Sequence, residues 1–271
     1  MTDTAHRITL PHTRPKYMLN SLAVRYKWRI FHRPCIHLTF TGHEYSGCCF
    51  HSQLCEDSKL RIYAVADIHG KADRIRQIRR HIAVTRPHVL IMAGDISGLT
   101  SPYRTLHQIN ALPVPVLYVR GNSDRGKTER FAEQLRNITS IHARRVFMHS
   151  IPITGIGGTI PVPFRSKISF AETSLLHRVE PLIDENTVLV VHPPPWGVLD
   201  AALGRFHVGS VNLRHFIESV QPRLVICGHI HECAGMDDIG KTRVVNCSMS
   251  RNHDGALIDI TPQKELIIAM I

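Results

Sequence analysis

Short apolar runs of strand length recur along the chain from residue 59 onward. They comprise Leu60–Ala66, His88–Ala93, Val116–Val119, Thr187–Val191 and Arg223–Cys227. Apolar runs of this length, bounded by Gly, Pro or polar residues, are typical of strands that are buried on both faces. Because several are separated by segments with helical periodicity, the pattern favours an α/β fold.

The segments between these strands carry the spacing expected of amphipathic helices. Lys71–Val84 places Ile75, Ile78 and Ile82 on one stripe. Ser210 is placed to cap a further helix, because the apolar residues after it recur at helical spacing. The other predicted helices are Ser101–Ala111, Thr128–Leu135 and Phe170–His177.

Two later parts of the chain lack this alternation of strand and helix. Residues 140–156 resemble short adjacent strands, and the tail resembles hairpins built from Arg243–Val245, Ala256–Ile260 and Leu266–Met270. Strand–helix units followed by β-rich segments predict two packed sheets with helices outside. We expect these elements to form one domain over residues 59–271.

Residues 1–58 differ from the rest of the chain. They are rich in His, Cys and Pro and show no sustained helix or strand period. Their potential metal ligands match no common zinc module, because no C-x₂-C pair has a matching second half. We therefore expect a poorly ordered N-terminal extension.

The composition limits the partners and the compartment. The net charge of +11 suits anionic partners such as phosphate esters, nucleotides or RNA, but a solvated basic face fits equally well. The seven cysteines are irregularly spaced, and neither a secretory signal nor an apolar run of about 20 residues is visible. We expect a cytoplasmic protein without a membrane partner; its oligomeric state stays open.

A side chain that can bind metal follows each of the five buried strands. The residues are Asp67 and His69, Asp95, Asn122, His192, and His229 and His231. Gly94, Gly121 and Gly228 directly precede three of them, and glycine lets the backbone turn sharply near an ion. Sites in parallel α/β sheets gather at the carboxyl ends of strands, so we expect these side chains to converge.

The spacing within two of these motifs predicts paired ligands. In an extended triplet the first and third side chains point the same way, so Asp67 would face one ion together with His69, and His229 with His231. Each motif alone is more often a surface turn than a site, but all five at strand ends argue against coincidence. Carboxylate, imidazole and amide ligands suit Mn, Fe, Zn, Co or Ni.

These motifs resemble those of the calcineurin-like metallophosphoesterases, and in particular of the small, Icc-related type. The resemblance covers about residues 59–271 and extends to His192-Pro-Pro-Pro-Trp-Gly, His207-Val-Gly-Ser and Val245-Asn246. It implies an α/β (α+β) fold with four layers, a β-sandwich flanked by helices. It also implies a hydrolase that acts on phosphate esters.

The resemblance further implies two divalent metal ions, with manganese favoured. Asp67, His69, Asp95 and His231 would hold one ion, and Asp95, Asn122, His192 and His229 the other. Asp95 would bridge the ions, and a metal-bridging hydroxide would be the nucleophile. Asp95 and Asn122 would thus also be catalytic.

One motif departs from the family pattern. Many relatives carry a histidine after Gly-Asn that protonates the leaving group, whereas this chain has Ser123, whose hydroxyl is too weak an acid. This departure favours a phosphodiester over a monoester substrate. His207 is a candidate substitute acid, with an exposed loop histidine as the alternative. Arg165 is a weaker candidate for a phosphate contact.

Four residues near these motifs have candidate supporting roles. Asp124 could orient the loop that carries Asn122, although a simple turn residue fits equally well. Asn246 is a candidate for orienting a histidine ligand by a hydrogen bond, without binding the metal itself. Cys227 and Cys247 are expected to fill the apolar core.

Two functions of other classes compete with the hydrolase. The first is a catalytically silent binding or scaffold protein of the same fold, which the intact ligand set argues against. The second is a nuclease or RNA-processing factor, suggested by the basic helix with Lys71, Arg74, Arg76, Arg79 and Arg80. A phosphate ester, with nucleotides among the candidates, is the expected substrate, and a nucleic-acid partner is not favoured.

Overall fold

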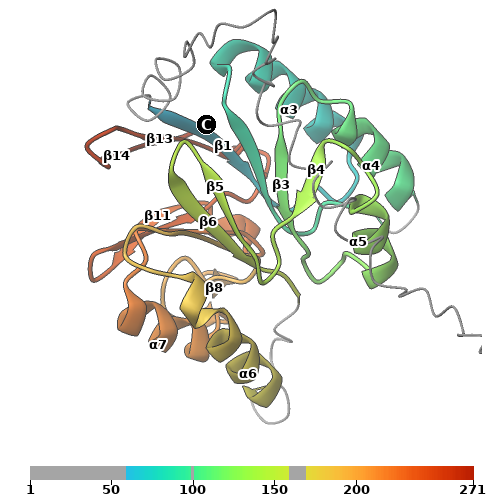
Figure 1. Ribbon diagram of the computed structural model, residues 1–271. Coiled ribbons are helices and arrows are strands. Elements are labelled where there is room, and N and C mark those ends of the chain that lie inside the picture. Colours follow the sequence, from blue (N-terminus) through green and yellow to red (C-terminus); the bar gives the residue numbers. More distant parts are fainter. Residues whose placement is uncertain (1–58, 99–100, 159–168) are drawn as a thin grey trace, which may run out of the picture. The chain divides into compact units, whose positions relative to one another are not determined.

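The computed structural model describes residues 59–98, 101–158 and 169–271. The predicted extension 1–58 and the candidate Arg165 lie outside these residues. Within them, two six-stranded mixed sheets pack face to face, with helices on both outer faces (Figure 1). This arrangement confirms the predicted α/β sandwich flanked by helices.

The first sheet has the strand order β14-β13-β1-β2-β3-β4. Strands β1 to β4 are parallel, whereas β13 runs antiparallel to β1 and β14 antiparallel to β13. The strands are β1 (Leu60–Val65), β2 (Val89–Ala93), β3 (Val116–Val119), β4 (Ile138–Ser140), β13 (Ala256–Ile260) and β14 (Leu266–Met270).

The second sheet has the order β11-β12-β10-β7-β6-β5. Strands β12, β10, β7 and β6 are parallel, and antiparallel strands form both edges. The strands are β5 (Arg145–Met148), β6 (Ile151–Ile156), β7 (Val188–Val191), β10 (Leu224–Cys227), β11 (Gly235–Ile239) and β12 (Thr242–Asn246).

Helices cover the outer face of each sheet, and their labels follow Figure 1. The first sheet packs against α3 (Ala72–Thr85), α4 (Pro102–Asn110) and α5 (Gly126–Ala132). The second packs against α6 (Ser169–Val179) and α7 (Val211–Val220). Short 3₁₀ turns η2 (Glu180–Leu182) and η3 (His231–Cys233) and a hairpin of β8 (Ala201–Ala202) and β9 (Phe206–His207) complete the described elements.

The core is divided into three apolar layers. The central layer lies between the sheets and includes Ile62, Ile91 and Ile226, all fully buried. Each outer layer lies between a sheet and its helices; the stripe of Ile75, Ile78 and Ile82 on α3 packs there as predicted. Cys227 and Cys247 are buried, which confirms their expected role as apolar core residues.

Helix α7 shows how local sequence fixes an element. Its N-cap Ser210 accepts a hydrogen bond from the backbone N–H of Leu213, as the sequence predicted. Leu213 and Ile217 then face the second sheet. None of the helices in the described ranges has the length and apolar character needed to span a bilayer.

Candidate metal centre

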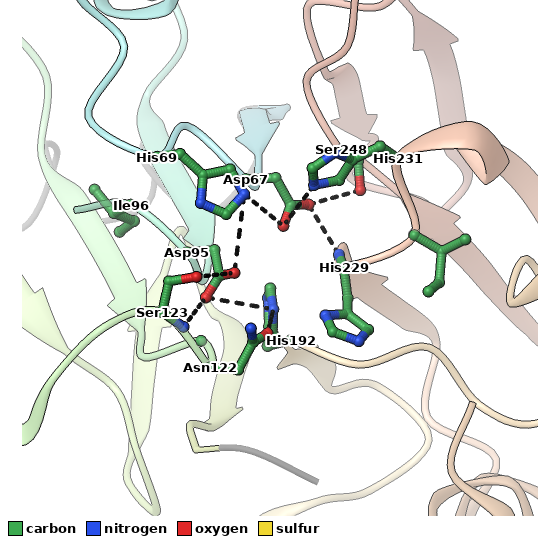
Figure 2. Close-up of polar contacts among 12 residues, drawn as sticks. Asp67, His69, Asp95, Ile96, Asn122, Ser123, His192, His229, His231 and Ser248 are labelled. Atoms are coloured by element: carbon green, nitrogen blue, oxygen red, sulfur yellow. Dashed lines mark hydrogen bonds and ion pairs between the residues drawn. The ribbon is translucent and has the colours of Figure 1, made fainter. Parts of the chain in front are cut away.

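The predicted metal-binding side chains converge where the two sheets present the carboxyl ends of their parallel strands (Figure 2). The loops after β1, β2 and β3 contribute from the first sheet, and those after β7 and β10 from the second. The side chains drawn in Figure 2 include Asp67, His69, Asp95, Asn122, His192, His229 and His231.

One cluster is formed by Asp67, His69 and His231, whose candidate ligand atoms lie within 4.8 Å of one another. Oδ1 of Asp67 is 3.4 Å from Nε2 of His231 and 3.9 Å from Nε2 of His69. The two imidazole rings lie with centroids 5.4 Å apart and their planes tilted by 57°. A carboxylate and two imidazoles at these separations can share one cation.

A second cluster combines Asp67, Asp95 and His192, with ligand atoms again within 4.8 Å. Asp95 lies between the two histidines: Oδ1 is 3.6 Å from Nε2 of His192, and Oδ2 is 3.9 Å from Nε2 of His69. His229 places its ring 5.0 Å from that of His192. The two oxygens of Asp95 therefore face both groups of histidines.

The hydrogen bonds of His192 indicate a cation between acceptors. Nδ1 is 2.8 Å from the carbonyl oxygen of Ala93, which can only accept, so Nδ1 carries the proton. The lone pair of Nε2 in the neutral ring then faces Oδ1 of Asn122 at 2.8 Å. Two acceptors at this distance repel unless a proton or a metal ion lies between them.

Asp67 presents a second sign that the residues suit a metal. Oδ2 accepts hydrogen bonds from the backbone N–H of His229 at 2.8 Å and from the hydroxyl of Ser248 at 2.7 Å. Oδ1 is buried and accepts no hydrogen bond from the described residues. Because burying an unsatisfied carboxylate oxygen is costly, this atom suits coordination of a cation.

The backbone at the ligands differs from the expected geometry. Asp67, His69, Asp95 and His229 have φ angles of 60°, 51°, 53° and 74°, in the left-handed region. The predicted extended backbone was therefore wrong for both triplets, although Asp67 and His69 still lie in one cluster, as expected. His231 faces Asp67, whereas His229 lies beside His192. Non-glycine residues in this conformation cost about 1 kcal/mol or more each and cluster at functional sites.

Glycines before the ligands make room for close packing. A Cβ at Gly94, where φ is 97°, would lie 2.5 Å from Nδ1 of His192. A Cβ at Gly121 would lie 2.2 Å from Oδ1 of Asp95. Both contacts are too short for any other residue, so these two glycines allow the ligand loops to approach one another.

The electrostatics of the cluster prepare it for a cation. Burial alone would raise the pKa of Asp67, but the contact with His231, the charge on His192 and the Ser248 hydroxyl lower it to about 2. Burial lowers the pKa of His69 and His229, against the opposing effect of nearby carboxylates. The close contact with the Asp67 carboxylate raises the pKa of His231, against the opposing effect of burial.

Buried polar residues hold the ligand loops in place. Asp124 accepts hydrogen bonds from the backbone N–H groups of Ile96, Ser97 and Gly121 and from the Ser97 hydroxyl. It thus joins the loop after Asp95 to the loop before Asn122, in agreement with its predicted orienting role.

Asn246 supports the other side of the centre, although it contacts no histidine side chain. It donates to the carbonyl oxygen of Ile230 at 2.9 Å, and its Oδ1 accepts from the backbone N–H of Ser248 at 3.1 Å. The Ser248 hydroxyl is 2.7 Å from Oδ2 of Asp67. This network fixes the backbone between His229 and His231.

Two residues at the centre carry no local signal in the sequence. Ser248 lies far from every ligand in sequence and reaches Asp67 only because residue 248 bridges Ala66 at the end of β1. The guanidinium of Arg74, in the first turn of α3, donates to the carbonyl oxygen of Asp67. Sequence periodicity had placed Arg74 only on a basic helix face.

The predicted acid His207 lies outside the two clusters, on strand β9. Its Nδ1 is 2.6 Å from Oδ1 of Asp200, which is buried. Oδ2 of Asp200 accepts from the backbone N–H groups of Gly197 and Gly209. The β8–β9 hairpin is held against the turn after His231, because Leu203 donates to Glu232 and the Cys233 thiol to Ala201.

Comparison with known proteins gives the class of this fold and the family of the chain. The model of the calcineurin-like phosphoesterase family matches residues 60–233. The chain therefore belongs to the calcineurin-like phosphoesterases, which are metal-dependent phosphoesterases with a dinuclear divalent centre.

Proteins related in sequence agree with this assignment. The chain is 29% identical to the uncharacterized protein MJ1162 of Methanocaldococcus jannaschii, over 70% of this chain and 88% of that protein. It is 26% identical to human metallophosphoesterase domain-containing protein 1, over 70% of this chain and 66% of that protein.

The fold is shared with a Thermus thermophilus protein, TT1561, at a TM-score of 0.59 and 15% identity, over 79% of this chain and 99% of that one. It is also shared with a dimetal phosphatase from Danio rerio, at a TM-score of 0.50 and 11% identity, over 78% of this chain and 98% of that one. At these identities the two structures support the fold alone.

Proposed function

We propose that this chain is a phosphodiesterase that uses two divalent ions, with manganese favoured. The observation that carries the proposal is the convergence of two acceptor clusters that share the buried carboxylate of Asp67, with Asp95 within 3.9 Å of a histidine from each. Asp67, His69, Asp95 and His231 would hold one ion, and Asp95, Asn122, His192 and His229 the other. When bound, the ions would activate a water molecule as the nucleophile and neutralise charge on the phosphoryl oxygens.

The residues of the centre have separate tasks in this proposal. Asp95 can reach both ions because its two oxygens face different histidines. His192 keeps the lone pair of Nε2 directed at the centre because Nδ1 donates to Ala93. Asp67, ionised far below neutral pH, supplies a negative charge that favours cation binding.

The preference for a diester rests on Ser123. Its hydroxyl donates to Oδ2 of Asp95 at 2.8 Å, and its backbone N–H donates to Oδ1 at 2.7 Å. Ser123 therefore orients a metal ligand and has no acidic proton for a leaving group. Substrates that expel a poor leaving group, such as alkyl monoesters, would need another acid.

His207 is our candidate for that acid. Asp200 fixes the ring by accepting from Nδ1, so a protonated His207 can donate from Nε2. The hairpin that carries it is anchored to the turn after the ligand His231. This position supports contact with a leaving group at the edge of the centre.

The test is hydrolysis by the full-length protein reconstituted with Mn²⁺, Fe²⁺, Ni²⁺ or Zn²⁺. We expect bis(p-nitrophenyl) phosphate to be cleaved faster than p-nitrophenyl phosphate. His207→Gln should lower kcat by about 100-fold or more for an alkyl leaving group and much less for p-nitrophenol, which needs no acid.

His215→Gln, a change at an exposed histidine of α7, is the matched control and should leave both rates unchanged. If His207→Gln lowers kcat equally for both leaving groups, His207 is not the acid that protonates the leaving group. Absence of hydrolysis with every metal would contradict the proposed activity.

We also propose a cytoplasmic location. Cys227, Cys233 and Cys247 are free thiols, as expected in a reducing compartment. Oxidation-state analysis of these three cysteines in cells would test the location, and a stable disulfide among them would argue against it.

A further inference from the structure

A rim of exposed cations borders the metal centre on the side of the first sheet. Helices α3, α4 and α5 begin shortly after β1, β2 and β3 end, so their first turns lie at the same edge as the ligands. A Cβ on Gly70, next to His69, would lie 3.1 Å from Oγ1 of Thr105, so the first turn of α4 packs beside the centre. The exposed cations of these turns are Lys71, Arg104, Arg125 and Lys127.

Arg74 brings a permanent positive charge closer still. Its guanidinium donates to the carbonyl oxygen of Asp67, and its side chain is half-buried. Positive charge beside a site for two dications opposes metal binding by Coulomb repulsion. An anion that binds to both the metal ions and the rim would offset this repulsion. The arrangement therefore indicates a ligand that carries more than one negative charge.

Exposed aromatic side chains lie at the same edge of the molecule. Phe206, 52% exposed, lies on β9 of the hairpin that is anchored to the turn after His231, and Trp196, 43% exposed, precedes this hairpin in sequence. Tyr103, 46% exposed, lies in the first turn of α4. Exposed rings that lie close to exposed cations can stack on the flat rings of a bound ligand.

The hairpin also combines an aromatic face with a cation. The guanidinium of Arg205 lies 4.9 Å from the centre of the Phe206 ring. The base of the hairpin is fixed by the buried Asp200, which accepts hydrogen bonds from Gly197, His207 and Gly209. Rings and charges are thus presented from a fixed support.

Cations that follow a backbone of phosphates, together with exposed rings for stacking, are the features that bind unpaired nucleic-acid strands. A duplex hides the faces of its bases and cannot use the rings. We propose that this rim binds single-stranded nucleic acid and presents one of its phosphodiesters to the metal ligands. This proposal rests on the proposed phosphodiesterase function and names its substrate class.

The opposite edge of the sandwich provides matched control residues. Lys264 lies in the turn before β14, near the amino end of β1, and Phe147 on β5 is 56% exposed near the amino end of β6. These residues have the same chemistry as Lys127 and Phe206 but lie far from the metal ligands along the strands.

The experiment measures binding of fluorescent, hydrolysis-resistant single-stranded RNA and DNA to the full-length protein with its metal ions over a range of salt concentrations. Arg125→Glu with Lys127→Glu should weaken binding and reduce the slope of log K against log salt by about 0.7 for each lost phosphate contact. Phe206→Ala should weaken binding roughly 5- to 100-fold. Lys264→Glu and Phe147→Ala should leave the affinity unchanged.

Several results would overturn the proposal. The first is that no single strand binds, and the second is that a duplex binds equally tightly. The third is an equal loss of affinity in the rim and control variants, which would show that only the total charge of the protein matters. Binding that survives both rim variants would place the strand elsewhere. If the wild type cleaves the aryl diester but binds no oligonucleotide, this proposal fails while the proposed function stands. If the rim variants weaken oligonucleotide binding but the wild type hydrolyses no diester, the binding surface stands while the proposed function fails.

Discussion

The hydroxyl of Ser123 donates to Oδ2 of Asp95 at 2.8 Å, so the residue that departs from the family pattern supports the carboxylate expected to bridge the metals. The backbone N–H of Ser123 donates to the other oxygen. Ser123 therefore orients Asp95 by hydrogen bonds, at the position where the family pattern has a histidine expected to transfer a proton. This relationship links the altered motif directly to metal binding.

Ser123→Ala should weaken metal binding by about 10-fold, because outer hydrogen bonds orient metal ligands. The backbone bond to Oδ1 would remain, so the site should not be lost. The measurement is competition with a metal indicator. Ser174→Ala, a change at an exposed serine of α6, is the control, and equal metal affinity in both variants would show that the Ser123 hydroxyl has no such role.

Asp124→Ala should lower the free energy of unfolding by about 3 kcal/mol, because several N–H donors and a hydroxyl would lose a buried carboxylate. Asp73→Ala, at an exposed position of α3, should change it by less than about 0.5 kcal/mol. Urea unfolding of the metal-free protein measures both. Similar small losses would mean that Asp124 does not hold the two loops together.

Metal affinity should fall as the pH drops through the pKa of His231, which the nearby Asp67 carboxylate raises above 6.5. The ligand must be neutral to bind a metal, so each ion that binds His231 displaces a proton below that pKa. The folding stability of the metal-free protein should depend on pH in the opposite direction. The interaction of protonated His231 with Asp67 stabilises the fold below pH 6.5, and this stabilisation is lost as the pH rises through the raised pKa. Metal titrations between about pH 5.5 and 8 test the first statement. A flat profile would contradict it.

Asp259 predicts a separate loss of stability in acid. Burial would raise its pKa, but hydrogen bonds from Arg61 and Lys59 lower it below 3.8. A lowered pKa in the folded state stabilises the protein above pH 3.8, and this contribution is lost as the pH falls through the lowered value. Asp259→Asn should flatten the acid limb of the unfolding curve, whereas Asp237→Asn, at an exposed position, should not.

The strands and the core could be predicted because burial leaves a strong local pattern. The bounds of Val116–Val119, Ala256–Ile260 and Leu266–Met270 are confirmed without change. Helix ends moved by one to a few residues; for example, α5 begins at Gly126 rather than Thr128. Capping and loop contacts set such ends, and they leave weak signals in sequence.

The β8–β9 hairpin was not predicted because its two-residue strands are too short to show alternation. The positions of the ligand side chains depend on left-handed backbone at Asp67, His69 and His229, which residue type does not predict. Ser248 was missed because its contact with Asp67 spans the two sheets. Sequence thus indicated which residues meet, while packing between the sheets determines how they meet.

The central claim is that Asp95 joins two metal sites in one catalytic centre. The direct measurement is metal content, by elemental analysis, together with hydrolysis of bis(p-nitrophenyl) phosphate for the wild type, Asp95→Ala and the exposed control Asp237→Ala. We predict that Asp95→Ala loses bound metal and hydrolysis together, while the control retains both. Retention of wild-type metal content and activity by Asp95→Ala would contradict the account.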